Sequence, residues 1–171
     1  MRKIPVFVSC PTTLNEEQDK KRNVIIRFLE ELQLEDRSLG RSDYPNDYPL
    51  KEVYVIAKHC AGGIILGFEQ IFVERGIRKR NTEEEKIIQA SDNLILPTPW
   101  NHLEAGILYG LKLPLLIFKE KDLEGGIFDI GISDVFIHEM PASDIKDEKV
   151  NELRQVFLKW FAEVSNHYYK Y

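Results

Sequence analysis

Short apolar runs alternate along the chain with longer segments in which apolar residues recur at helical spacing. Uninterrupted apolar runs are typical of strands that are buried on both faces of a parallel sheet. The clearest runs are residues 4–10 (IPVFVSC), 62–68 (GGIILGF) and 113–120 (LPLLIFKE). We also expect a short strand that begins at Leu34 and a last strand over residues 134–140.

The segments between these runs place apolar residues three and four positions apart, which predicts amphipathic helices. We expect helices over residues 15–33, 50–60, 98–112 and 147–169. Asn15 and Thr98 are residue types that cap a first helical turn, and Pro99 suits the first helical position. Trp160 in the last helix falls on its apolar face, so we expect it in the core.

Strands that alternate with helices predict an α/β domain, with an open parallel sheet of about five strands and helices on both faces. A chain of 171 residues suits one domain over residues 1–171. In such folds, ligands bind beyond the carboxyl ends of the strands. This rule directs attention to the loops after Cys10, Leu39 and Phe68, and to the helix start at residues 99–104.

Residues 69–93 interrupt the alternation with a basic cluster followed by an acidic one (ERGIRKRNTEEEK). One interpretation is a solvated hairpin or a mobile loop. The other is a long loop or lid, at about residues 69–97, that closes over a binding site, because long loops in compact domains are often functional.

The formal net charge of -5 argues against a surface dedicated to nucleic acid. Cys10 and Cys60 lie in unrelated contexts, without the spacing of a zinc site or a disulfide framework, and two free thiols suit a reducing cytoplasm. The N-terminal apolar run is too short for a signal peptide, and no run approaches the length of a membrane span. We therefore expect a cytoplasmic protein without a metal site or membrane contact.

One carboxylate stands out in an otherwise apolar helix, in the stretch PTPWNHLEAGILYG. Residues four apart lie over one another on a helix, so Trp100 and Glu104 share a face with Leu108. Apolar neighbours would partly desolvate this carboxylate and raise its pKa. A carboxylate beside an aromatic ring can bind ribose hydroxyls or stabilise a sugar cation. The alternative is an exposed glutamate without a chemical role.

Two loops supply further candidates. Arg41 can bind a phosphate or carboxylate with two hydrogen bonds, and Asp43 can accept one from a ribose; a turn with a surface ion pair is the alternative. The loop after residues 4–10 (SCPTTLN) offers hydroxyls and backbone donors at a helix start, a candidate phosphate cradle. We predict Glu104 as the catalytic residue. The predicted substrate-binding residues are Ser9, Pro11, Thr12, Arg41, Asp43, Phe68, Trp100, Asn101 and His102.

Residues 94–118 carry a family resemblance. The stretch TPWNHLEAGILYGLKLPLLIF resembles the active-site helix of Toll/interleukin-1 receptor (TIR) domains and of nucleoside 2-deoxyribosyltransferases. Trp100 and Glu104 match the spacing from tryptophan to catalytic glutamate in NAD-cleaving TIR enzymes. Glu104 and Gly106, followed by KLPLLIF, look like the deoxyribosyltransferase pattern. The segment VFVSC keeps the FVS of a TIR opening strand, which implies that Ser9 lies near the site.

The resemblance implies a flavodoxin-like fold and an action on the bond between a sugar and a nitrogen base. We expect hydrolysis of an N-glycosidic bond in a nucleotide such as NAD, which would be a substrate and not a cofactor. Base exchange between deoxynucleosides, and a non-catalytic module that senses nucleotides or binds a protein partner, stay open as alternatives. A homo-oligomer also stays open. Bacterial TIR-like proteins of this kind often belong to antiphage defence.

Overall fold

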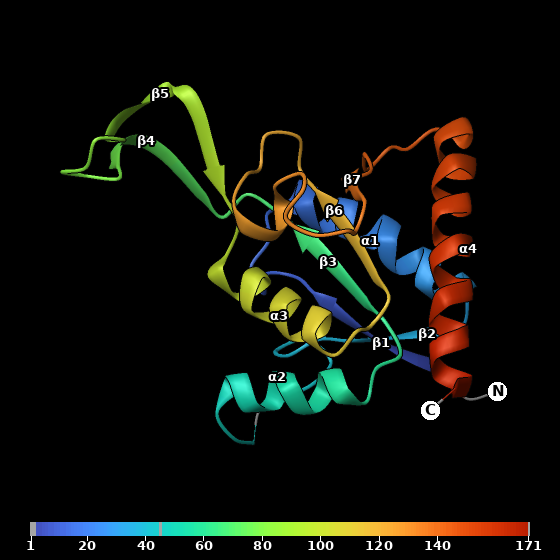
Figure 1. Ribbon diagram of the computed structural model, residues 1–171. Coiled ribbons are helices and arrows are strands. Elements are labelled where there is room, and N and C mark those ends of the chain that lie inside the picture. The colour runs from blue at the N-terminus through green and yellow to red at the C-terminus, as the bar shows by residue number, and fades with distance from the viewer. Residues whose placement is uncertain (1–2, 45, 171) are drawn as a thin grey trace.

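The structure is a computed structural model that describes residues 3–44 and 46–170 (Figure 1). It confirms the alternation of strands and helices that the sequence predicts. The strands of the main sheet are β1 (Ile4–Ser9), β2 (Leu34–Arg37), β3 (Gly63–Gly67), β6 (Leu115–Lys119) and β7 (Ile137–Glu139). The helices are α1 (Glu16–Glu31), α2 (Pro49–Lys58), α3 (Pro99–Gly110), α4 (Asp147–Lys170) and the short 3₁₀ helix η1 (Gly126–Phe128).

The five strands of the main sheet are all parallel and lie in the order β2-β1-β3-β6-β7. Counted along the chain within this sheet, the order is 2-1-3-4-5, which is the flavodoxin-like order of doubly wound folds. The chain reverses its direction of travel across the sheet between β1 and β3. The carboxyl ends of these two strands therefore border the crevice in which such folds bind ligands.

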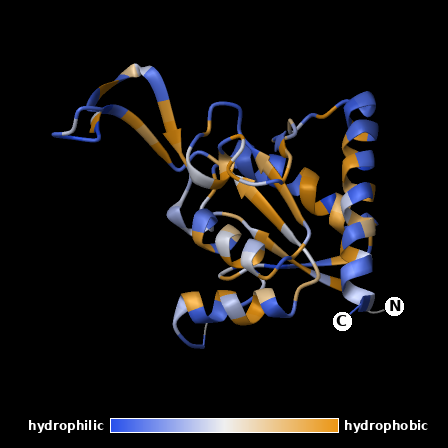
Figure 2. Cartoon of the chain, in the orientation of Figure 1, coloured by the Kyte–Doolittle hydropathy of each residue, from blue (hydrophilic) through white to orange (hydrophobic). Residues whose placement is uncertain are grey.

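Helices cover both faces of the sheet, as predicted: α1 and α4 lie on one side and α2 and α3 on the other (Figure 1). The central strands β1, β3 and β6 are predominantly hydrophobic (Figure 2). Successive side chains of a strand point to opposite faces, so Val6 and Val8 pack with α1 and α4, whereas Phe7 packs with α2 and α3. Ser9, two residues after Phe7, accordingly belongs to the α3 side.

Both predicted helix caps are confirmed. The side chain of Asn15 accepts a hydrogen bond from the backbone N–H of Gln18 at 2.9 Å, and the Gln18 side chain accepts from the Asn15 N–H at 3.2 Å. Thr98 Oγ1 accepts from the Trp100 N–H at 3.3 Å. The last strand is shorter than predicted: β7 pairs with β6 over three residues, and Phe136 before it is 74% exposed.

The excursion after β3 is an antiparallel hairpin of β4 (Ile71–Arg78) and β5 (Lys86–Leu96), and it projects away from the main sheet (Figure 1). The hairpin interpretation is confirmed, and the alternative that this segment closes over a site as a lid stays a prediction. Strand periodicity in this segment is hidden because most of its side chains are exposed on both faces. The base is closed by the Gln70 N–H, which donates to the Leu96 carbonyl at 3.0 Å.

Across residues 3–44 and 46–170, no helix combines the length and the apolar composition that a membrane span requires.

Candidate functional site

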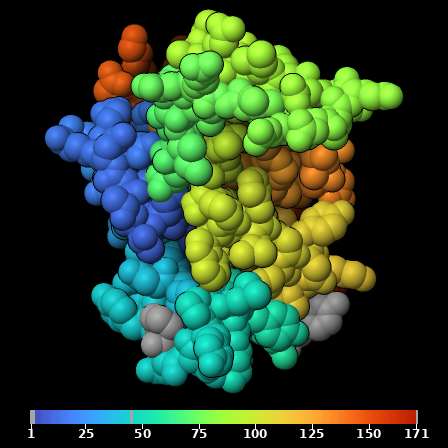
Figure 3. Space-filling model, turned by 90° about the vertical axis from the view of Figure 1, so that its left-hand side faces the viewer, coloured from blue at the N-terminus to red at the C-terminus, as the bar shows by residue number. Residues whose placement is uncertain are grey.

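A pocket of about 310 Å³ opens at the carboxyl ends of β1 and β3. Its walls come from the β1–α1 loop, the turn after β2, the base of the hairpin and the first two turns of α3. The lining residues are Cys10, Pro11, Thr12, Thr13, Leu39, Gly40, Gln70, Thr98, Trp100 and Glu104. Figure 3 views the molecule from this side, with α3 in yellow between the hairpin and α2. The pocket occupies the position that the strand order predicts for a ligand.

Glu104 and Trp100 lie on the same side of α3 and both face this pocket, as their spacing predicts. Glu104 is 9% exposed, whereas Trp100 is 41% exposed at the pocket mouth. Burial raises the pKa of Glu104 from its ordinary 4.5 to about 7, because a carboxylate loses hydration in this position. The alternative interpretation, in which Glu104 is an exposed residue without a chemical role, is therefore wrong about its exposure, because the side chain is buried.

Ser9 and Asn101 lie directly behind Glu104 and are fully buried. The Ser9 hydroxyl is hydrogen-bonded to the Glu104 carboxylate, which partly opposes the effect of burial on its pKa. The Asn101 Nδ2 donates to Ser9 Oγ at 2.9 Å and to the Leu66 carbonyl of β3 at 3.3 Å. The structure thus brings two predicted residues into contact with each other, and one of them with Glu104, beneath the pocket.

Arg41 does not line the pocket. One of its terminal nitrogens donates to the backbone carbonyls of Pro11 at 2.8 Å and Thr12 at 3.1 Å. The guanidinium therefore holds the β1–α1 loop, which forms one wall of the pocket. The predicted role of Arg41 in binding a ligand phosphate is not supported by this arrangement.

Asp43 does not line the pocket either. It forms a two-point ion pair with Arg37, whose Nε lies 2.8 Å from Asp43 Oδ2 and whose terminal nitrogen contacts the other carboxylate oxygen. This pairing lowers the pKa of the Asp43 carboxyl. The predicted contact between Asp43 and a ribose is not supported by this arrangement, because the carboxylate is paired with Arg37 and does not line the pocket. The ion-pair alternative is correct, with Arg37 as the partner.

Two further predicted residues lie outside the pocket walls. Phe68 is fully buried in the core on the α1 and α4 side. His102 packs edge-on against Phe128, with ring centroids 5.8 Å apart, and burial lowers its pKa. Neither Phe68 nor His102 therefore lines the pocket, and the predicted contact of these two side chains with a substrate is not supported.

The prediction missed six lining residues, which are Cys10, Thr13, Leu39, Gly40, Gln70 and Thr98. The carboxyl-end rule had pointed to their loops, but it does not say which side chain of a loop faces inward. Cys10 is not an activated nucleophile, because burial raises the pKa of its thiol to about 11.

The pocket wall carries little positive charge. Within the described part of the chain, neither a lysine nor an arginine lines it. The start of α1 is already capped by Asn15 and Gln18, and its first turn contains Glu16, Glu17 and Asp19. These carboxylates disfavour an anion at that helix terminus. The predicted phosphate cradle in SCPTTLN is therefore not supported.

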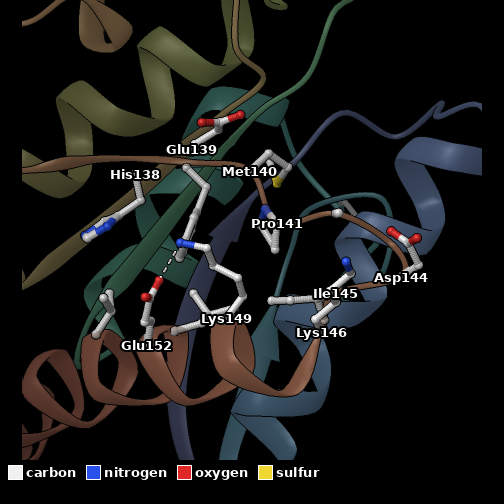
Figure 4. Close-up of a pocket in the computed structure, with 13 residues that line it drawn as sticks. His138, Glu139, Met140, Pro141, Asp144, Ile145, Lys146, Lys149 and Glu152 are labelled. Atoms are coloured by element: carbon white, nitrogen blue, oxygen red, sulfur yellow. Dashed lines mark hydrogen bonds and ion pairs between the residues drawn. The ribbon is translucent and has the colours of Figure 1, made fainter.

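A second pocket of about 510 Å³ lies between β7 and the start of α4 (Figure 4). Apolar side chains such as Phe118 and Leu153 line it together with charged residues. Lys149 and Glu152 on its wall pair with each other at 2.8 Å. This pocket contains no buried carboxylate, so the smaller pocket at Glu104 is the better candidate for chemistry.

No protein-family model matches the chain, and a search of curated proteins finds no match. The structure supports an α/β fold with a five-stranded parallel sheet. In the segments 3–44 and 46–170, no three His, Cys, Asp or Glu side chains form a group that could hold a metal ion. The function must therefore be argued from the geometry around Glu104.

Proposed function

We propose that this protein is an enzyme that cleaves the N-glycosidic bond of a nucleotide of the NAD type, with Glu104 as its catalytic carboxylate. The observation that carries the proposal is the position of Glu104: it is 9% exposed and lines the pocket at the switch point of the sheet, together with the half-exposed ring of Trp100. The resemblance of residues 94–118 to TIR enzymes and deoxyribosyltransferases supports the same assignment.

The reaction needs a group that stabilises positive charge on the sugar. As the bond from C1′ to the base nitrogen breaks, the bonding electrons leave with the base and C1′ becomes cationic. An ionised Glu104 in a desolvated pocket stabilises this cation by its charge, or traps it as a covalent ester. Water then adds to C1′ and releases a proton to the solvent. If an ester has formed, its bond between C1′ and the Glu104 oxygen breaks in this step, and the carboxylate is regenerated. Trp100 provides an aromatic surface on which the base or the sugar can pack.

The nature of the leaving group explains why one carboxylate suffices. Glu104 is the one acidic side chain among the described residues that line the pocket. Glycosidases that expel a poor leaving group use a second carboxyl group as an acid. Nicotinamide is attached through a cationic ring nitrogen and departs as a neutral molecule, so it requires no proton. A pocket with a single carboxylate therefore suits a nicotinamide nucleotide.

The test is nicotinamide release from NAD by the purified protein. We expect turnover by the wild type and a loss of at least about 100-fold in Glu104→Gln, because the charge at the reacting centre is removed. Asp43→Asn is the matched control, since it removes a carboxylate that is paired with Arg37 outside the pocket. Equal rates for the wild type and Glu104→Gln would refute the proposal.

A second candidate is base exchange between deoxynucleosides, and the lack of a lysine or arginine in the described pocket lining favours it. A nucleoside carries no phosphate, so it needs neither the lysine nor the arginine that the described lining lacks. This activity predicts turnover of a deoxynucleoside when a second free base is supplied. Binding of intact nucleotide without turnover in either assay would instead identify a non-catalytic module.

A further inference from the structure

The side-chain amide of Asn101 has one allowed orientation. Its Nδ2 lies 3.3 Å from the Leu66 carbonyl oxygen and 2.9 Å from Ser9 Oγ. A backbone carbonyl can only accept a hydrogen bond, so the amide nitrogen, not the amide oxygen, must face Leu66. The same nitrogen then donates its other hydrogen to Ser9.

This orientation also determines where the Ser9 hydrogen goes. A serine hydroxyl has one hydrogen to donate, and Ser9 Oγ already accepts from Asn101. Asn101 Oδ1 has no hydrogen-bond partner among the described residues, so it does not receive the Ser9 hydrogen. Glu104 is the group with which Ser9 is hydrogen-bonded on the other side.

We infer that Asn101 is a positioning residue, which holds the Ser9 hydroxyl so that its hydrogen points at the carboxylate of Glu104. The chain of hydrogen bonds connects β3, α3 and β1 and ends at the pocket. A donor directed at a carboxylate favours its ionised form, which opposes the effect of burial. The use of that ionised form in catalysis rests on the proposed function; the chain of hydrogen bonds does not.

Other charged groups near Glu104 do not replace this donor. Cys10, from the β1–α1 loop, also lines the pocket, and Glu104 helps to raise the pKa of its thiol. Burial is the main cause of the raised value, about 11, which keeps Cys10 neutral near pH 7. Arg22 and Arg41 act on Cys10, whose pKa they lower. On α3 itself, His102 interacts with Asp129.

The first experiment uses the ligand-free wild-type protein. Carbon-detected NMR follows the titration of the Glu104 carboxyl, which is assigned by its loss in Glu104→Gln. In the same samples, the side-chain amide resonance of Asn101 is followed against pH. We expect both to titrate with the same midpoint, near pH 7, because the Ser9 hydroxyl connects them. An Asn101 amide that does not respond to pH across this midpoint would overturn the inference.

Variants then test whether Asn101 influences the titration midpoint of Glu104 through Ser9. Ser9→Ala and Asn101→Leu should each raise the Glu104 midpoint by about one pH unit, since a hydrogen bond to a charged group is lost. Their combination should raise it no further, because the two residues act as one unit. A midpoint that rises in Ser9→Ala but stays unchanged in folded Asn101→Leu would refute the role of Asn101. The wild-type measurement decides the question if Asn101→Leu does not fold.

Activity gives a separate readout. If turnover requires ionised Glu104, a midpoint raised by one unit lowers the rate at pH 7 by about fivefold and leaves the plateau at high pH unchanged. A purely structural defect would instead lower the plateau. A protein without turnover can still pass the NMR test, so the proposed function and the positioning role fail independently.

Discussion

The hydroxyl of Ser9, at the carboxyl end of β1, is hydrogen-bonded to the carboxylate of Glu104, in the second turn of α3. The two residues come from elements that are far apart in the chain and meet because β1 and α3 lie at the same edge of the sheet. The contact places a buried acid beside a donor and next to a pocket. Its consequences can be measured in the folded protein without knowledge of the ligand.

The stability of the protein should depend on pH through Glu104. Its pKa is about 7 in the folded protein, against 4.5 ordinarily, so the folded state holds the proton more tightly between these values. Unfolding then releases a proton, and the free energy of unfolding falls as pH rises through this window. The contribution amounts to about 3 kcal/mol at pH 8 relative to pH 4.

Chemical denaturation of the wild type and Glu104→Gln across this pH range measures the effect. We expect the stability of Glu104→Gln, relative to the wild type, to increase from pH 4.5 to pH 7 and then to level off. Asp43→Asn serves as a contrast, because Arg37 lowers the pKa of Asp43. Its contribution to stability is lost only at pH values below this range, so its difference from the wild type should stay nearly constant here. A stability difference between Glu104→Gln and the wild type that is independent of pH would contradict the burial argument.

Trp100 should contribute to ligand binding and little to stability. Its side chain is 41% exposed at the pocket mouth, so truncation removes few core contacts. Trp100→Ala should weaken nucleotide binding by about tenfold, since stacking on an aromatic ring contributes roughly 1–3 kcal/mol. Calorimetric titration checks this, with Trp100→Phe as the variant that keeps an aromatic surface. Equal affinity of Trp100→Ala and the wild type would remove Trp100 from the site.

Replacement of Arg41 should weaken the binding of all ligands by a similar factor. Its guanidinium donates to the carbonyls of Pro11 and Thr12 and therefore holds the loop, not a phosphate. Arg41→Ala should weaken the binding of a nucleoside and of its 5′-monophosphate by the same factor, about threefold to tenfold. The ratio of the two affinities is the measurement. A loss confined to the monophosphate would show that Arg41 binds phosphate directly.

Two glycines provide a matched pair for the packing near the site. A Cβ on Gly67, at the end of β3, would lie 2.6 Å from atoms of both Leu123 and Phe128. Gly67→Ala should therefore destabilise the protein by about 1–3 kcal/mol through overpacking. A Cβ on Gly106 in α3 meets nothing within 4 Å, so Gly106→Ala should stabilise it by about 0.5–1 kcal/mol. Thermal unfolding distinguishes the two, and a Gly67→Ala variant as stable as the wild type would contradict the packing.

Much of the architecture could be predicted because buried parallel strands and amphipathic helices leave strong patterns in a sequence. The pairing of Trp100 with Glu104 follows from helical geometry alone, and the structure confirms it. Asp43 shows where this reasoning ends. Arg41 is the basic residue nearest to it in sequence, but the ion pair forms with Arg37, because the turn after β2 brings the chain back beside that strand.

The hairpin was harder to predict for a different reason. A buried strand is recognised by its apolar run, and an exposed ribbon lacks one. Polar residues and charges of both signs occupy β4 and β5, so the segment has the composition of a loop. The hairpin depends on pairing between two strands, and neither strand has a strong sequence pattern by itself. Gln70 at its base reaches the pocket wall, which no local pattern could indicate.

The closed base of this hairpin makes it a natural insertion point for protein engineering. The hairpin leaves the domain at Gln70 and returns at Leu96. The backbone hydrogen bond of 3.0 Å between these two residues holds the ends of the hairpin together, independently of the sequence of its turn. A reporter or an affinity tag inserted into the turn between Arg78 and Lys86 would be attached at the tip of the hairpin, away from the main sheet. The loops that surround Glu104 would keep their positions, so ligand binding could be measured with the labelled protein.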